Sequence, residues 1–208
     1  MPTTDRRPLA SRQSRWAATT LRLLLKTPIT ANQISLLGIL FAALGAWALV
    51  EAPLRPWLFL VAALCIQLRL VCNLMDGLVA VEGGRGAPTG ALYNEVPDRL
   101  EDALLLAGFG FAAGLLWLGL VAGILAVFTA YVRAVGASHG FPQDFRGPMA
   151  KPQRMAALTL GCLLGFVEVL GWNSVYSLQV ILAVIVVGAA ITGVRRLRTI
   201  AAALEARP

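Results

Sequence analysis

Acidic residues gather in one short part of the sequence. Six of the eleven Asp and Glu residues fall between positions 76 and 102: Asp76, Glu82, Glu95, Asp98, Glu101 and Asp102. Carboxylates crowded together repel one another unless a cation lies among them. Oxygen ligands of this kind select Mg²⁺, Mn²⁺ or Ca²⁺, and Mg²⁺ commonly completes its shell with phosphate oxygens. The cluster therefore predicts a divalent-cation site that acts on a diphosphate.

Helical spacing would bring these polar groups to one face. At 100° per residue, an arc of about 100° on a helical wheel holds four of them: Asn94, Asp98, Glu101 and Asp102. Glu95 widens the arc to about 120°. On the preceding apolar stretch, Asn73 and Asp76 lie one turn apart and can face this stripe. The alternative is that the acids only cap helix ends and pair with nearby arginines, namely Arg69, Arg85 and Arg99.

The elements that carry these residues have the composition of membrane spans. Of the 208 residues, 58% are hydrophobic and 14% are charged, whereas a soluble domain averages about 25% charged residues. An ordinary soluble globule and a disordered tail are thereby excluded. A span needs roughly 20 apolar residues, and six can be drawn: 30–50, 57–80, 91–116, 119–137, 155–172 and 175–194. We expect one all-α integral membrane domain with six transmembrane helices at 30–194 and a cytoplasmic tail at 195–208.

Basic residues predict the orientation. Residues 5–26 form a basic amphipathic pattern that suits a helix in the membrane interface, within a cytoplasmic segment 1–28. Three of the connections carry a single basic residue, Arg55: those near 51–56, 117–118 and 172–174. The other side receives both basic termini and the remaining basic loop residues, namely Arg85, Arg146, Lys151 and Arg154. The positive-inside rule puts both termini and the acidic cluster on the cytoplasmic side. The membrane surface, rather than nucleic acid, explains the net charge of +7.

Three cysteines, Cys65, Cys72 and Cys162, lie in apolar stretches without a CxxC motif or a histidine partner. Residues of this kind are typically inert and buried. We expect no redox or metal chemistry from them.

The acidic region resembles a family pattern. CDP-alcohol phosphotransferases carry D-x-x-D-G-x-x-A-R, then eight residues, then G-x-x-x-D-x-x-x-D. This chain has N-L-M-D-G-L-V-A-V at 73–81 and G-A-L-Y-N-E-V-P-D at 90–98, with eight residues between them. The spacing agrees throughout, and the residue type agrees at five positions: Asp76, Gly77, Ala80, Gly90 and Asp98. The tract T-A-N-Q-I-S-L-L-G at 30–38 is similar to the stretch that opens the family's first span. The chain is thus identified as resembling a divergent bacterial branch of this family.

The resemblance implies roles for individual residues. It implies Mg²⁺ (or Mn²⁺) as the cofactor that holds the CDP diphosphate, with four ligand positions: Asn73, Asp76, Asn94 and Asp98. Asp98 matches the general base, and Asp102, one turn beyond it, is a second candidate for ligand or base. The implied substrate-binding residues are Gly77, Ala80, Arg85, Gly90, Arg133, Lys151 and Arg154. In the family, basic residues near the last three bind the phosphate of an acceptor that carries one.

Three substitutions depart from the family pattern. Asn73 and Asn94 stand where the pattern has Asp, and Val81 stands where it has Arg. Because Asn is a neutral oxygen ligand, metal affinity should fall unless other acids compensate, and the candidates are Glu95, Glu101 and Asp102. Arg85 is the candidate that replaces the missing arginine.

The implied reaction is attack by an alcohol on the β-phosphorus of a CDP-alcohol such as CDP-diacylglycerol, which releases CMP. We expect a homodimer that works in phospholipid synthesis at the bacterial cytoplasmic membrane. The acceptor stays open among glycerol phosphate, inositol phosphate, serine and other hydroxyl compounds. A membrane prenyltransferase would need a second acidic motif, and a transporter would be expected to show inverted repeats or broken helices. The stronger alternative is a catalytically degraded relative with a lipid-binding or scaffold role.

Overall fold

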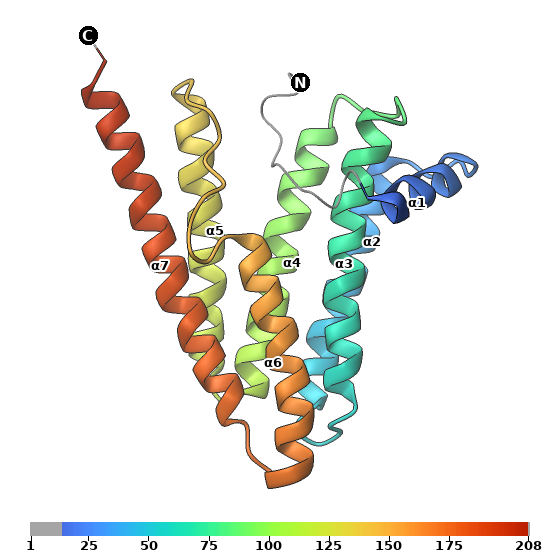
Figure 1. Ribbon diagram of the computed structural model, residues 1–208, viewed down its shortest axis with the longest axis vertical. Coiled ribbons are helices and arrows are strands. Elements are labelled where there is room, and N and C mark those ends of the chain that lie inside the picture. The colour runs from blue at the N-terminus through green and yellow to red at the C-terminus, as the bar shows by residue number, and fades with distance from the viewer. Residues whose placement is uncertain (1–13, 208) are drawn as a thin grey trace.

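Seven helices account for most of the part of the chain that the computed structural model describes, residues 14–207. They are α1 (Arg15–Leu25), α2 (Ala31–Glu51), α3 (Leu58–Val81), α4 (Gly90–Ala112), α5 (Leu116–Ser138), α6 (Lys151–Trp172) and α7 (Tyr176–Glu205). Figure 1 shows α2 to α7 running along one another, while α1 lies across the bundle at its side. The all-α prediction is therefore confirmed.

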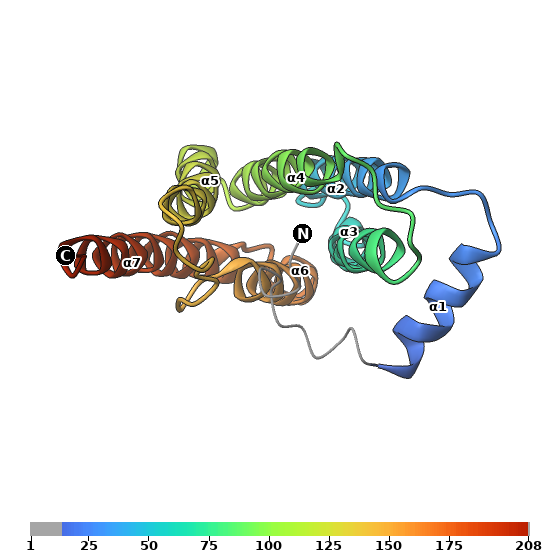
Figure 2. The same ribbon diagram turned by 90° about the horizontal axis from the view of Figure 1, so that it is seen from above.

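The six long helices form two rows. Seen from above, α2, α4 and α5 make one row and α3, α6 and α7 the other (Figure 2). α2 packs on α3 and α4, α5 packs on α4 and α7, and α6 packs on α3 and α7. The helices converge at the end that holds the short connections. They diverge at the opposite end, called here the wide end, where the α3–α4 and α5–α6 connections and the C-terminus lie (Figure 1).

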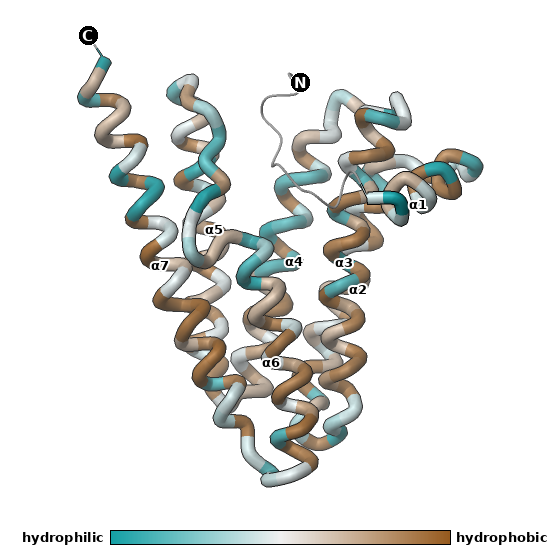
Figure 3. The backbone as a smooth tube through the Cα atoms, viewed as in Figure 1, coloured by the Kyte–Doolittle hydropathy of each residue, from teal (hydrophilic) through white to brown (hydrophobic). Residues whose placement is uncertain are grey.

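Five of these helices are long and apolar enough to cross a bilayer: α2, α3, α5, α6 and α7. The chain is a multi-pass integral membrane protein. The sixth expected span, α4, has 23 residues, but between 95 and 102 it carries five charged residues: Glu95, Asp98, Arg99, Glu101 and Asp102. Figure 3 shows this as a hydrophilic stretch in the half of α4 nearest the wide end, above a hydrophobic remainder. The prediction of six spans is thus confirmed for the five apolar helices.

Some helix boundaries differ from the expected spans. α6 begins at Lys151 rather than at 155, because Pro152 occupies the first turn, where its missing N–H costs nothing. α7 continues through Glu205, where we expected a tail from 195. The basic and alanine-rich end of α7 consists of good helix formers with no Gly or Pro between 194 and 207. Of the amphipathic segment expected at 5–26, only 14–26 lies within the described residues.

The interior of the bundle is apolar and tightly packed. Phe59, Phe109 and Leu158 are fully buried in it, and the three cysteines are buried as free thiols, as predicted. α4 and α5 approach closely because neither Gly110 nor Gly119 has a side chain. A Cβ added at Gly110 would lie 2.6 Å from the Cα of Gly119.

The start of α2 explains part of the T-A-N-Q tract. The Thr30 hydroxyl accepts a hydrogen bond from the Gln33 amide (3.3 Å), and the Gln33 side-chain oxygen accepts one from the Thr30 amide (2.9 Å). This capping box satisfies two amides that the first helical turn would otherwise leave without partners. The tract therefore positions α2, whose Ser35 reaches the site described next.

Candidate active site

Asp76 is a buried carboxylate on α3 near the wide end. It is 4% exposed, and its Oδ2 accepts a 2.7 Å hydrogen bond from the Ser35 hydroxyl on α2. Its Oδ1 is buried without a hydrogen bond of normal geometry to any residue in 14–207, although the Gly77 amide lies near the carboxylate. A buried carboxylate oxygen without a partner is costly. Oδ1 is thus a candidate ligand for a cation.

Asp98 on α4 faces Asn73 on α3 across the ammonium group of Lys151. The Lys151 Nζ donates to the Asn73 side-chain oxygen and to the Asp98 Oδ1. The Asp98 Oδ2 accepts from Arg99 at 3.2 Å. Lys151 is 8% exposed, which places it inside the bundle at the first residue of α6. Two of the predicted ligands are therefore brought together, with a basic residue between them.

Asp102 belongs to a different, fully buried network. Its Oδ1 accepts from Arg69 at 2.5 Å and its Oδ2 from Arg154 at 2.7 Å. Arg69 also donates to Glu101 at 2.5 Å. All of these side chains are 2% exposed or less. Both oxygens of Asp102 are bound by arginines and the side chain is fully buried, so no substrate can reach it in this arrangement.

The acids that were expected to compensate for the asparagines are engaged elsewhere. Glu95 accepts two hydrogen bonds from Arg133, at 2.6 and 2.7 Å, and Glu101 accepts from Arg69 and, at 3.1 Å, from the Asn73 amide. Arginine pairing was the alternative considered for these acids. In the structure arginines bind Glu95 and one oxygen of Glu101, while Glu101 Oε1 has no hydrogen-bond partner among residues 14–207.

A small cavity next to Asp98 is lined mostly by cations. It measures about 20 Å³ and is bordered by Arg99, Thr129, Ala130, Arg133, Lys151, Arg154 and Arg196. Arg196 has no described carboxylate within 4.0 Å; it donates instead to the backbone oxygens of Thr129 (2.8 Å) and Arg146 (3.1 Å). Positive charge in excess of the nearby carboxylates favours an anion at this place, and the space present in the structure is that of about one water molecule.

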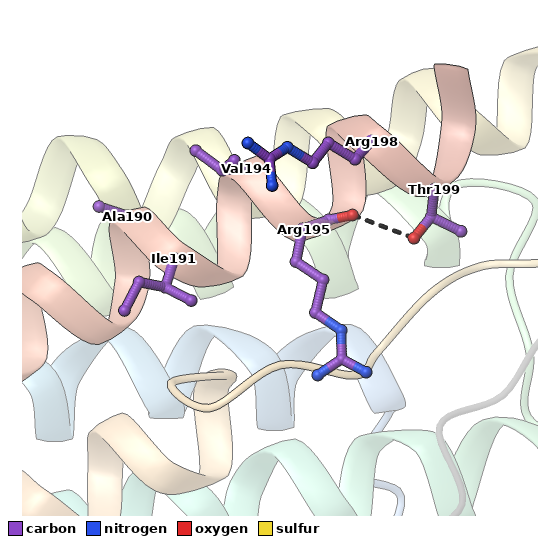
Figure 4. A pocket seen from close by; sticks show the side chains of 6 residues that line it. All are labelled: Ala190, Ile191, Val194, Arg195, Arg198 and Thr199. Atoms are coloured by element: carbon purple, nitrogen blue, oxygen red, sulfur yellow. Dashed lines mark hydrogen bonds between the residues drawn. The ribbon is translucent and has the colours of Figure 1, made fainter. Parts of the chain in front are cut away.

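Arg196 and Arg99 were not among the residues expected at the site. Arg196 was counted with the basic C-terminus, yet it is 4% exposed. The spacing did contain a signal, because Ile185, Ala189 and Thr192 precede it at helical intervals on the same buried face of α7. Its neighbours Arg195 and Arg198 instead line an open hollow on α7 (Figure 4). The hollow measures about 620 Å³, and none of the residues that line it is among the expected site residues.

Several expected residues lie outside this arrangement. Arg85 donates to the backbone oxygens of Leu25 (2.9 Å), Thr27 (2.7 Å) and Ile29 (3.1 Å), so it ties the α3–α4 connection to the segment between α1 and α2. Asn94 is exposed on the first turns of α4. Ala80 is half-buried against the small apolar cluster beneath α1.

Gly77 and Gly90 face open space. A Cβ added at either one would meet no atom within 4 Å beyond its immediate neighbours. Close helix packing therefore does not require glycine at these positions, whereas a ligand approaching the backbone would. Gly38 contrasts with them, because a Cβ there would lie 2.5 Å from Glu101 Oε1.

The residues present fit a divalent-cation site that has fewer carboxylate ligands than the family motif. No group of three His, Cys, Asp or Glu side chains that could hold a metal exists among residues 14–207. Two of the four expected ligand positions are asparagines, whose side-chain oxygens are neutral donors. The unpartnered Oδ1 of Asp76 and the open space before Gly77 leave room for a hard cation with oxygen ligands from a diphosphate.

No family model matches the sequence, but individual proteins do. The chain is 34% identical over 148 residues to a bifunctional IPC transferase and DIPP synthase of Rubrobacter xylanophilus, covering 68% of this chain and 33% of that protein. It is 25% identical over 183 residues to a phosphatidylinositol phosphate synthase of Mycolicibacterium smegmatis, covering 85% of this chain and 79% of that one. The chain thus spans about a third of the length of the first relative.

Solved structures show the same fold. The Mycobacterium tuberculosis phosphatidylinositol phosphate synthase with CDP-DAG bound superposes with a TM-score of 0.73 at 23% identity, covering 90% of this chain and 94% of that one. Its complex with manganese and citrate gives 0.72 at 22% identity, over 88% and 87%. These relatives, together with the spacing of the α3–α4 motif, confirm the resemblance to the CDP-alcohol phosphotransferase family.

Proposed function

We propose that this protein is a metal-dependent CDP-alcohol phosphotransferase that moves a phosphatidyl group from CDP-diacylglycerol to an alcohol and releases CMP. One observation carries the proposal: two motif carboxylates lie near the wide end, Asp76 next to Gly77, where a Cβ would meet open space, and Asp98 bonded to Lys151, which lines the cationic cavity. The relatives named as synthases and the CDP-DAG-bound structure support the choice of donor.

The chemistry follows from the groups around this space. Mg²⁺ or Mn²⁺ bound at Asp76, with oxygens of the diphosphate completing its shell, would neutralise the diphosphate; a solved relative contains manganese. Asp98 accepts the proton of the acceptor hydroxyl. The hydroxyl oxygen then bonds to the β-phosphorus, and the bond from that phosphorus to the bridging oxygen breaks with its electron pair leaving on CMP.

The acceptor is proposed to carry a phosphate of its own, as inositol phosphate does. Arg196 has no carboxylate partner within the described residues, and its guanidinium lies beside those of Arg133 and Arg154 at one cavity. Guanidinium groups bind phosphate through paired hydrogen bonds. The names of the two relatives, an IPC transferase and a phosphatidylinositol phosphate synthase, agree with such an acceptor.

The membrane placement extends the same proposal. α4 would be the sixth span, since about 34 Å of helix packs between α2 and α5 and its charges face partners in the bundle. α1 would lie in the interface with Trp16 and Leu23 exposed to lipid. The wide end would face the cytoplasm of a bacterial cell, and the working unit would be a homodimer.

A comparison of acceptors tests the proposed substrate class. The purified protein is incubated in detergent with CDP-diacylglycerol, Mn²⁺ and one alcohol at a time: inositol phosphate, glycerol phosphate, inositol, glycerol or serine. We expect CMP release with a phosphorylated acceptor only. Arg196→Gln should raise KM for that acceptor by about 10-fold or more, equivalent to about 1.4 kcal/mol, with a smaller effect on KM for the donor.

Two results would contradict this assignment. Equal rates with inositol and inositol phosphate would remove the argument for a phosphate-binding cavity. Absence of CMP with every acceptor, together with nucleotide binding that is independent of metal, would favour the degraded relative, to which the two asparagines point.

A further inference from the structure

Lys151 lies inside the bundle at a position that the proposed reaction does not use. Its ammonium group lies between Asn73 on α3 and Asp98 on α4 and bonds to an oxygen of each. Both are positions that the family motif gives to acidic residues. A lysine that served the acceptor alone would need its charge free, whereas this one is bound to two expected metal ligands.

We propose that the Lys151 ammonium is a built-in cation of this site, so that the protein takes up one divalent cation per chain, at Asp76. The inference rests on the proposed function, because it concerns the metal that function requires. It adds a property that the family motif does not contain, because a side chain supplies one of the positive charges of the site.

The charges of the described residues support this arrangement. Of the four motif positions, Asn73 and Asn94 are neutral, and only Asp76 and Asp98 are carboxylates. Lys151 and Arg99 neutralise Asp98, which leaves Asp76 as the one motif carboxylate without a cationic partner within 4.0 Å among the described residues. A second dication would have to lie near Lys151 with a single carboxylate to share, and repulsion between the two cations is strong in a partly buried site.

The chemistry of lysine also suits the position. Lys carries a compact charge with three donors, so it can bind an amide oxygen and a carboxylate together and keep a third donor for a phosphate oxygen. Asn73 is fixed for this contact, because its amide nitrogen donates to Glu101 (3.1 Å) and to the Arg69 backbone oxygen (3.2 Å). Its oxygen is thereby turned toward Lys151. Asp76, in contrast, keeps an oxygen without a partner.

Manganese binding at equilibrium tests the proposal without reference to turnover. The full chain is purified in detergent, stripped of metal and titrated with Mn²⁺, and free Mn²⁺ is measured from its electron paramagnetic resonance signal. We expect one Mn²⁺ per chain in the wild type and loss of that binding in Asp76→Asn. Lys151→Met should bind a second Mn²⁺ or bind the first at least about 10-fold more tightly, a change of about 1.4 kcal/mol.

Two further variants keep the result interpretable. Arg195→Gln removes one positive charge from the exposed hollow on α7 and should leave Mn²⁺ binding unchanged. Asn73→Asp retains Lys151 and is informative even if Lys151→Met does not fold. It should still bind a single Mn²⁺, because the ammonium occupies the space between α3 and α4.

The contrary outcomes are distinct. Two Mn²⁺ per wild-type chain or in Asn73→Asp, or identical binding by the wild type and a folded Lys151→Met, would overturn the role of Lys151 and leave the proposed function intact. Absence of Mn²⁺ binding in the wild type and in Lys151→Met alike would instead contradict the proposed function itself.

Discussion

Asp98 and Asp102 are one helical turn apart, yet their surroundings suit them to different roles. Asp98 is reached by Lys151 and Arg99, and 14% of its side chain is exposed. Asp102 is enclosed by Arg69 and Arg154. A base must exchange its proton with a substrate, so exposure favours Asp98.

Asp98→Asn should therefore lower the rate of CMP release by roughly 100-fold or more, the usual contribution of a general base. The amide oxygen can still accept the hydrogen bond from Lys151, but the charge that pairs with Lys151 and Arg99 is lost, so the unfolding temperature should fall and rates are compared on folded protein. Turnover under saturating substrate is the measurement. A rate within a few-fold of wild type would reject Asp98 as the base.

Substitutions at two glycines provide a matched pair of variants. Gly77→Ala adds a methyl group where no atom lies within 4 Å, whereas Gly38→Ala puts one 2.5 Å from Glu101 Oε1. The first should leave the unfolding temperature unchanged and lower CMP release, because the methyl occupies substrate space. The second should destabilise the fold by about 1–3 kcal/mol through overpacking. Thermal unfolding and CMP release measured on both variants check this; a fully active Gly77→Ala would show that no ligand approaches that backbone.

Among the elements, α3, α4 and α6 are joined by buried charges. Arg69 on α3 binds Glu101 and Asp102 on α4, and Asp102 binds Arg154 on α6. Arg69→Met would leave two carboxylates buried without their main partner, which should cost about 3–5 kcal/mol of stability. The exposed pair of Arg55 and Glu51 supplies the control, since Arg55→Gln should cost roughly 0–1 kcal/mol. Similar unfolding temperatures for the two variants would deny the network its structural role.

The connection between α3 and α4 holds α1 through Arg85. Its guanidinium donates to three backbone oxygens between Leu25 and Ile29. Arg85→Gln should therefore speed proteolysis within residues 20–30. The dissociation constant of the nucleotide should stay within about two-fold of the wild-type value. Loss of nucleotide affinity with unchanged proteolysis would restore the nucleotide contact that the sequence suggested for this residue.

At the scale of the whole molecule, hydropathy and charge predict most of the architecture. Apolar length located the helices to within a few residues at most ends, because a bilayer imposes both length and composition. It missed polar helical ends, such as the start of α6 and the last turns of α7, where helix formation continues without apolar residues.

The motif spacing predicted the acidic site only in part. Asn73, Asp98 and Lys151 do meet, but the sequence could not decide which acids pair with arginines. That choice depends on residues far apart in the chain, such as Arg133 with Glu95 and Arg154 with Asp102. The sequence did not indicate Arg196, because attraction to the membrane surface already explains a cluster of arginines at this end of the chain.

Metal-dependent release of CMP from CDP-diacylglycerol tests the central claim most directly. The wild type should release CMP with a phosphorylated polyol and Mn²⁺, release none after chelation, and lose the activity in Asp76→Ala and Asp98→Ala variants that still fold. CMP release that is undiminished in both variants, or that persists without metal, would contradict the assignment of this site as the catalytic centre.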